Sequence, residues 1–202
     1  TRKESSAASD VYKRQLQSAM IAREEVGYAP IHIVDSRNVT LAEQLLVRRA
    51  CNLASAGLTA ADITQDLEAA RERIRLLAIV DTLKYLHKGG RLSGAAALAG
   101  GLLGVKPVVG ITDGKLGMMG KARGMAGAYV ALFKLIEEQG GIDEAEPYLV
   151  GYTGSRAQAT PFVRFVSQNL GLERPPVLPI GTVIGTHAGP GAAGIAFFAK
   201  EG

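Results

Sequence analysis

The sequence has one cysteine, no tryptophan and no long hydrophobic run, and each shortage argues against a class of protein. With Cys51 alone, no disulfide can form within the chain, which favours a cytoplasmic setting over a secreted one. No run of about 18 apolar residues occurs, so we expect no transmembrane helix. Aromatic residues make up 5% of the chain and do not alternate with basic ones, which argues against binding nucleic acid by base stacking.

Sequence motifs for metal binding or nucleophilic catalysis are missing too. The chain has no Cys and His cluster with metal-ligand spacing, no G-x-S-x-G elbow and no G-x-x-x-x-G-K-[ST] phosphate loop. Residues Gly189–Gly194 fit the dinucleotide fingerprint G-x-G-x-x-G, but Pro190 restricts the backbone there and no βαβ pattern accompanies it. We therefore expect no metal, no cofactor and no catalytic residue.

The composition is that of a folded globular protein with one basic segment. Of the 202 residues, 47% are hydrophobic and 21% are charged, which suffices to bury a core. The formal net charge is only +4, but residues 84–123 hold seven Lys or Arg and a single acidic residue, Asp113. Such a segment is typical of a solvated surface, or of a docking face for a phosphate or an acidic partner.

Residues 1–15 do not resemble the start of a domain. They lack apolar periodicity, and the run DVYKRQ at 10–15 is what one frame of a common sequencing-adapter oligonucleotide encodes. We interpret 1–15 as an artefactual or disordered leader, and the chain as a fragment.

Helical and extended patterns alternate in the first part of the chain, which predicts an incomplete N-terminal α/β domain with a parallel sheet over 16–80. Cys51 lies in one of the helical segments, where we expect it to be buried. The predicted helices span 16–26, 41–56 and 59–74, and the predicted strands span 31–34 and 76–80.

After Asp81, hairpin signals mix with helical ones, which predicts a C-terminal α/β domain with a mixed sheet over 81–202. Asp113-Gly114 is a strong hairpin turn, and Ser155 with Gln158 forms a capping box. Helices are predicted over 83–87, 93–103, 124–139 and 155–170, and strands over 105–111, 115–119, 148–152, 177–180 and 182–186.

Two short motifs combine glycine with a group that can bind an anion. In KGGRLS, at 88–93, Arg91 precedes a helix start and can hold a carboxylate or phosphate with two parallel hydrogen bonds. In THAGPG, at 186–191, His187 follows a strand and can donate to an anion, with glycine N–H groups nearby. The alternatives are a helix stop with a surface arginine, and a turn histidine without a role.

A third motif, GKARG at 120–124, lies between the hairpin and a helix. Lys121 and Arg123 can form an anion site there, or simply lie on the solvent side of the helix start.

Together these motifs resemble the DegV family of lipid-binding proteins, including the binding subunit of bacterial fatty-acid kinases, with the N-terminal part truncated. The resemblance covers 16–202 and rests on VDS at 34–36, VDTLKYLHKGGRLS at 80–93, LGVKPVV at 103–109, DG at 113–114, KARG at 121–124 and IGTHAGPG at 184–191. It departs at Lys13-Arg14-Gln15, which stand where the family has Ser-Gly-Thr, so the hydroxyl groups expected to bind a carboxylate are absent.

The resemblance implies a two-domain protein that holds a long-chain fatty acid, such as palmitate, between its domains. It implies that His187 and Arg91 bind the carboxylate and that Thr186, Gly189 and Gly191 form the adjacent loop. The expected role is a non-catalytic cytoplasmic carrier in fatty-acid metabolism and lipid transport. It would present the acid to a kinase, carry the acyl phosphate and touch the membrane surface only transiently.

The resemblance leaves the basic residues Lys88, Lys121 and Arg123 for docking a partner or a phosphate. An alternative is an enzyme or sensor acting on a phosphorylated small molecule, with Arg91, Lys121 and Arg123 as phosphate clamps and His187 as acid or base. A third interpretation is a regulatory module that binds nucleic acid through the basic segment.

Overall fold

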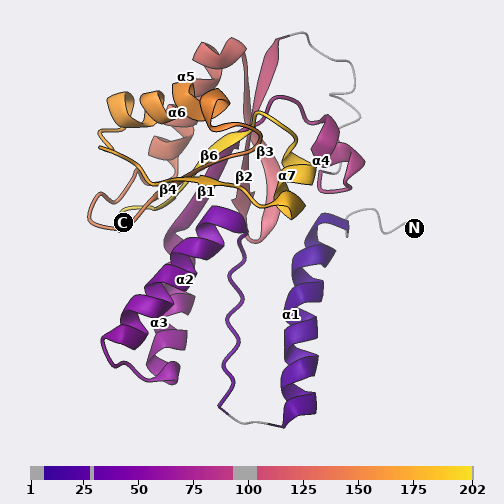
Figure 1. Cartoon of the computed structure of the whole chain (residues 1–202), viewed down its shortest axis with the longest axis vertical. Helices are drawn as coiled ribbons and strands as arrows, with labels where there is room; N and C mark the ends of the chain where they lie inside the picture. The colour runs from indigo at the N-terminus through magenta and orange to yellow at the C-terminus, as the bar shows by residue number, and fades with distance from the viewer. Residues whose placement is uncertain (1–6, 28–29, 93–103, 202) are drawn as a thin grey trace.

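The computed structural model describes residues 7–27, 30–92 and 104–201, and the helix expected over 93–103 lies outside them. The described residues build one sheet with helices on both faces (Figure 1). The helices are α1 (Ala7–Val26), α2 (Thr40–Ser55), α3 (Ala60–Arg73), α4 (Lys84–Lys88), α5 (Gly124–Glu138), α6 (Arg156–Asn169) and α7 (Thr182–Ala188). The strands are β1 (Ile74–Ile79), β2 (Val105–Thr112), β3 (Lys115–Arg123), β4 (Leu149–Tyr152), β5 (Val177–Pro179) and β6 (Ala193–Phe198).

The six strands lie in the order β3-β2-β1-β6-β4-β5, and the β4–β5 pair is the parallel one among antiparallel neighbours. This confirms the expected α/β class and mixed sheet. The strand β6 was not predicted, although all six of its residues are buried and its run of apolar residues is typical of a central strand.

The predicted parallel sheet over 16–80 is wrong. Both edges of β1 are taken by antiparallel partners, β2 and β6, so residues 31–34 cannot pair with β1. Those residues are extended but form no strand. The division into domains at residue 81 stays a prediction, although β1 precedes that position and lies in the interior of the sheet.

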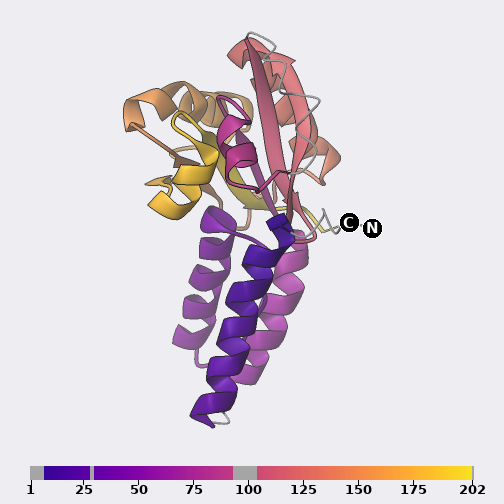
Figure 2. The same cartoon turned by 90° about the vertical axis from the view of Figure 1, so that its right-hand side faces the viewer.

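Helix α1 includes most of the segment expected to be a leader. Its described part starts at Ala7, and residues 7–15 include good helix formers such as Ala, Lys, Arg and Gln. Residues Ala7–Gln15 are therefore helical, and the interpretation of residues 1–15 as a leader stays a prediction. Figure 1 shows the extended segment 30–39 between α1 and the α2–α3 pair, and Figure 2 shows α1 standing in front of that pair.

The two faces of the sheet carry separate cores. Leu77, Ile79 and Val108 pack on one face against α5 and α6, whereas Leu76 and Ile111 pack on the other with α2 and α3. Helix α2 buries Leu41, Ala42, Leu45 and Leu46 toward the sheet. Cys51 lies on the other side of this helix and is exposed, so the prediction of a buried cysteine is wrong.

Local capping and turn signals are confirmed. Ser155 and Gln158 form the predicted capping box of α6, and Thr59 Oγ1 accepts from Asp62 N at 3.2 Å at the start of α3. The Asp113-Gly114 turn joins β2 to β3 with positive φ at both residues, 50° and 71°. These contacts span few residues, which makes them readable from sequence.

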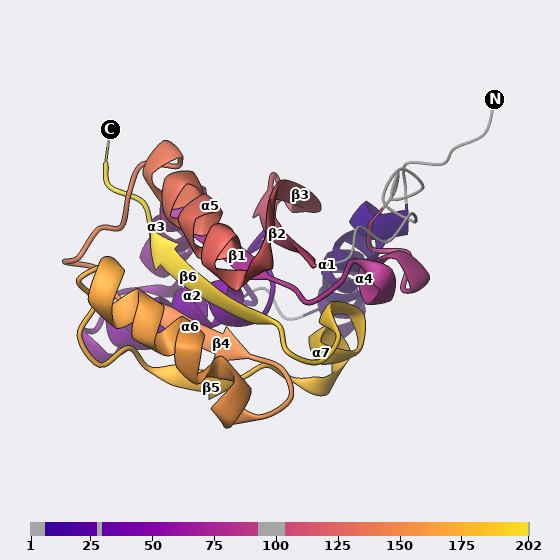
Figure 3. The same cartoon turned by 90° about the horizontal axis from the view of Figure 1, so that it is seen from above.

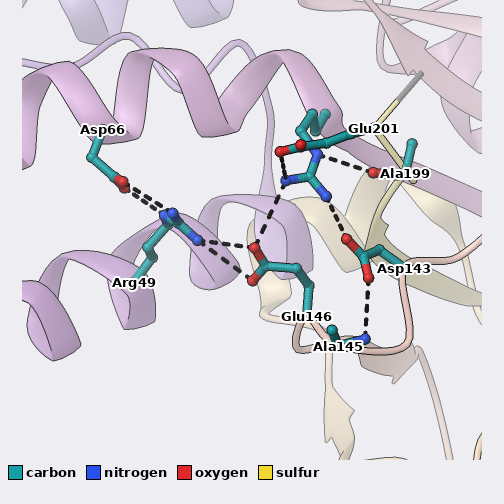
Figure 4. Close-up of polar contacts among 8 residues, drawn as sticks. Arg49, Asp66, Asp143, Ala145, Glu146, Ala199 and Glu201 are labelled. Carbon is teal, nitrogen blue, oxygen red and sulfur yellow. Dashed lines mark hydrogen bonds and ion pairs between the residues drawn. The ribbon is translucent and has the colours of Figure 1, made fainter.

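A network of ion pairs and hydrogen bonds joins α2 and α3 to the segment before β4 and to Ala199, which follows β6 (Figure 4). Arg49 donates to Asp66 at 2.5 and 3.0 Å and to Glu146 at 3.2 Å. Arg73 donates to Asp143 at 2.6 Å and to Ala199 O at 3.1 Å. The hydrogen bonds from Arg49 hold the pKa of Asp66 below its ordinary value.

Candidate functional site

A cavity of about 510 Å³ lies on the α2 side of the sheet and extends to α4 and α7. This volume is typical of small-molecule sites, and most of its wall is apolar. Its lining residues are Gln15, Val39, Thr40, Leu41, Glu43, Leu76, Ala78, Val80, Leu86, Arg91, Val109, Gly110, Ile111, Leu116, Ile180, Gly181, Thr182, Val183, Ile184, His187, Ala188, Ala192 and Gly194.

Alternation along the strands builds the apolar wall. Leu76, Ala78 and Val80 face the cavity from β1 and the residue after it, whereas Leu77 and Ile79 face the core under α5. The strand β2 repeats this arrangement, with Val109 and Ile111 in the wall and Val108 in the core. Because successive side chains of a strand point to opposite faces, one sheet serves both the core and the cavity.

Helices α4 and α7 bring Arg91 and His187, which the two motifs indicated separately, to the wall of the same cavity. The two helices are almost a hundred residues apart in sequence and lie side by side (Figures 1 and 3). Arg91 follows the end of α4, where its backbone N–H donates to Leu86 O at 2.9 Å. Its Nη1 donates to Gly89 O at 2.5 Å, so the guanidinium is held by the local backbone.

His187 lies in the last turn of α7 rather than at the end of a strand, so the strand predicted over 182–186 is wrong. The segment closes as a short helix, in which Gly185 N donates to Gly181 O and Gly189 N to Gly185 O, both at 2.9 Å. Burial and the positive charge of Arg91 lower the pKa of His187, which favours the neutral imidazole.

The loop after α7 is fastened to the end of β4 by a residue that the motifs did not indicate, Thr153. This buried hydroxyl donates to Gly189 O at 2.5 Å and accepts from Ala192 N at 2.9 Å. Gly191 N donates to Thr153 O at 3.3 Å. The Gly189 and Gly191 N–H groups are therefore engaged within the fold, and the expected help from them in binding an anion is not seen.

The other predicted residues lie outside the cavity wall. Thr186 is exposed, and its Oγ1 donates to Thr182 O at 2.8 Å. Lys88 ends α4 and is exposed. Lys121 and Arg123 are exposed. They belong to β3, which ends at Arg123 and is four residues longer than the predicted strand that ended at 119.

Strand register places Lys121 and Arg123 on the same face of the hairpin as the cavity. Lys121 lies opposite Pro107 and Arg123 opposite Val105. Positions 105, 107 and 109 alternate to one face, and Val109 lines the cavity. A basic surface therefore continues from the cavity face of the β2–β3 hairpin.

Two polar residues of the wall were not predicted. Glu43 lines the cavity from the first turn of α2 and remains exposed to solvent. Gln15 lines it from α1, and it is one of the three residues that replace the Ser-Gly-Thr of the family pattern.

Within the described ranges, no group of three His, Cys, Asp or Glu residues is placed to hold a metal ion. No helix among the described residues is long and apolar enough to cross a membrane.

Comparisons with solved structures identify the fold. A DegV family protein from Thermus thermophilus, solved in a study of its fatty acid binding, has a TM-score of 0.77 at 28% identity. The match covers 92% of this chain and 66% of that one. The Fak B3 protein of the Streptococcus pneumoniae fatty acid kinase, loaded with linoleic acid, has a TM-score of 0.79 over 94% of this chain and 67% of that one. At 20% identity, this second match shows a likeness of fold alone.

Comparisons of sequence agree. A DegV domain-containing protein of Caldanaerobacter subterraneus is 35% identical over 185 residues, which are 91% of this chain and 66% of that protein. The chain thus spans about two thirds of the length of the proteins it matches. A family profile described as "Uncharacterised protein, DegV family" matches residues 5–200. Since this match covers almost the whole sequence, the chain belongs to the DegV family.

Proposed function

We propose that this chain is the major part of a protein that binds one long-chain fatty acid in the cavity between α2, the sheet and the α4–α7 pair. In this proposal the carboxylate lies at Arg91 and His187, and the tail lies along β1 and β2. The observation that carries the proposal is a largely apolar cavity of about 510 Å³ with a guanidinium and an imidazole together in its wall.

The energetics of a fatty acid suit such a site. A buried methylene contributes roughly 0.8 kcal/mol, so a long tail dominates affinity and needs an apolar wall. The carboxylate must be paired, because an unpaired buried charge is costly. Arg91 supplies a permanent positive charge, and the imidazole of His187 can donate a hydrogen bond to the same carboxylate.

Relatives support the same ligand class. The Thermus thermophilus protein is 28% identical and is described by its fatty acid binding, and a DegV family protein from Streptococcus agalactiae, also 28% identical, is described as fatty acid binding. The alternative of an enzyme or sensor for a phosphorylated molecule needs Arg91, Lys121 and Arg123 around one phosphate. Of these three residues only Arg91 lines the cavity, so this alternative has less support.

The finer role in this proposal is that of a non-catalytic, cytoplasmic carrier. It presents the acid, with palmitate as one candidate, to a fatty-acid kinase and then carries the acyl phosphate. The exposed Lys88, Lys121 and Arg123 form the docking surface for the kinase or for the phosphate. A binding assay with the kinase subunit tests this role. The Lys121→Ala and Arg123→Ala variants should lose kinase binding and should still bind the fatty acid.

Native mass spectrometry tests the ligand directly. The protein, purified from bacteria and desalted mildly, should retain a mass in the fatty-acid range or gain one with added palmitate or oleate. His187→Ala and Arg91→Ala should lower this occupancy, whereas Lys134→Ala, which removes an exposed charge on α5, should not. A wild-type protein that takes up neither acid would refute the proposal.

A further inference from the structure

The contact between α4 and α7 is made through two glycines, each facing a side chain of the other helix. Gly89, after α4, lies against His187 of α7. Gly189, after α7, lies against Tyr85 of α4. The arrangement is reciprocal, because the glycine that follows each helix packs against an aromatic ring of the other helix.

Gly89 is required for space and not for backbone conformation. Its φ is −77°, which any residue adopts readily. A Cβ at this position would overlap Nδ1 of His187 and lie 2.8 Å from its Cε1. Any side chain here would therefore displace the imidazole, the backbone or both.

The same glycine also holds the arginine. Gly89 O accepts from Arg91 Nη1 at 2.5 Å. Gly89 therefore contacts both groups: its Cα packs against the imidazole of His187, and its carbonyl oxygen accepts a hydrogen bond from the guanidinium of Arg91. The Nδ1–Cε1 edge of His187 lies against Gly89, so a ligand cannot approach the imidazole from that side.

Gly189 completes the contact from the other side. A Cβ there would overlap the Tyr85 ring and lie 2.8 Å from its Cγ. Its φ of 77° favours glycine in addition, so this position is constrained twice. The hydrogen bond from Thr153 to Gly189 O connects this contact to β4.

We propose that Gly89 is a positioning residue of the ligand site, which sets the distance between Arg91 and His187 so that both reach one anionic head group. This inference rests on the proposed function for the identity of the ligand, but the contact itself can be tested without one. Gly189 and Tyr85 hold the two helices at the separation that this arrangement needs.

The expected effect of Gly89→Ala is a loss of palmitate affinity of roughly tenfold or more, the size expected for one hydrogen bond to a charged group. The matched control is Gly117→Ala on β3, where an added Cβ meets nothing within 4 Å and no positive φ is involved. This control should bind palmitate like the wild type. Gly89→Ala should also shift the imidazole NMR signals of His187, and the control should not.

A double-mutant cycle separates positioning from general damage. In His187→Ala the ring is gone, and the next atom near an added Cβ is Tyr85 O at 3.2 Å. Adding Gly89→Ala to that variant should therefore cost little further stability in urea unfolding, whereas it is costly in the wild type. If Gly89→Ala alone fails to fold, recovery of folding in the double variant supports the proposal.

Three results would overturn it. These are unchanged His187 signals and affinity in Gly89→Ala, equal destabilisation in both backgrounds, or failure of both the single and the double variant to fold. A wild-type protein that binds no palmitate would instead refute the proposed ligand, and the NMR signals and the unfolding cycle would still decide the role of Gly89.

Discussion

A larger side chain at Ala78 should reduce the space in the cavity and weaken the binding of long-chain acids. The loss of binding free energy should be proportional to the number of tail methylenes that the side chain displaces. Ala78 lies in β1 opposite Val109 and Gly194, and all three residues line the cavity. Ala78→Leu adds three carbon atoms to the side chain, and these carbons occupy the space of about three tail methylenes. At about 0.8 kcal/mol each, the loss is about 2.4 kcal/mol, or roughly 60-fold in affinity.

Isothermal titration calorimetry with palmitate and octanoate measures this effect. Palmitate should lose more affinity than octanoate, because the longer tail fills more of the wall. Ala126→Leu, on the exposed face of α5, adds the same carbons outside the cavity and should leave both affinities unchanged. Unchanged palmitate binding in Ala78→Leu, or an equal loss in both variants, would refute the placement of the tail along β1.

Three further predictions concern stability and reactivity. Thr153→Val removes the bonds to Gly189 O and Ala192 N and should cost roughly 1–3 kcal/mol in urea unfolding; an unchanged midpoint would show that these bonds contribute nothing. The lowered pKa of Asp66 means that its pairing stabilises the fold above its ordinary pKa and is lost as the pH falls through the folded value. Unfolding free energies measured from about pH 6 to about pH 3 should therefore fall less steeply in Asp66→Asn. Exposed Cys51 should react with a thiol reagent at one equivalent in the folded protein, and protection until unfolding would contradict its position on α2.

Local sequence signals determined most of the elements. Thr59 with Asp62, Ser155 with Gln158, and Asp113-Gly114 marked helix starts and a hairpin, because those interactions join residues at most three positions apart. The glycine-containing motifs also marked Arg91 and His187, which the fold brings to one cavity. Their pairing came from the resemblance to a family, since nothing local connects residues almost a hundred positions apart.

The tertiary structure alone decided the strand partners and the surroundings of the site. Residues 31–34 have a strand-like pattern but do not join the sheet, whereas the small and apolar β6 forms hydrogen bonds with β1 and β4. The roles of Thr153 and Gly89 likewise depend on the α7 loop packing against β4 and α4. Strand pairing, burial and the close approach of two helices depend on residues that are distant in sequence, because backbone groups and side chains find their partners only in the folded chain. Helix starts and turns depend on neighbouring residues.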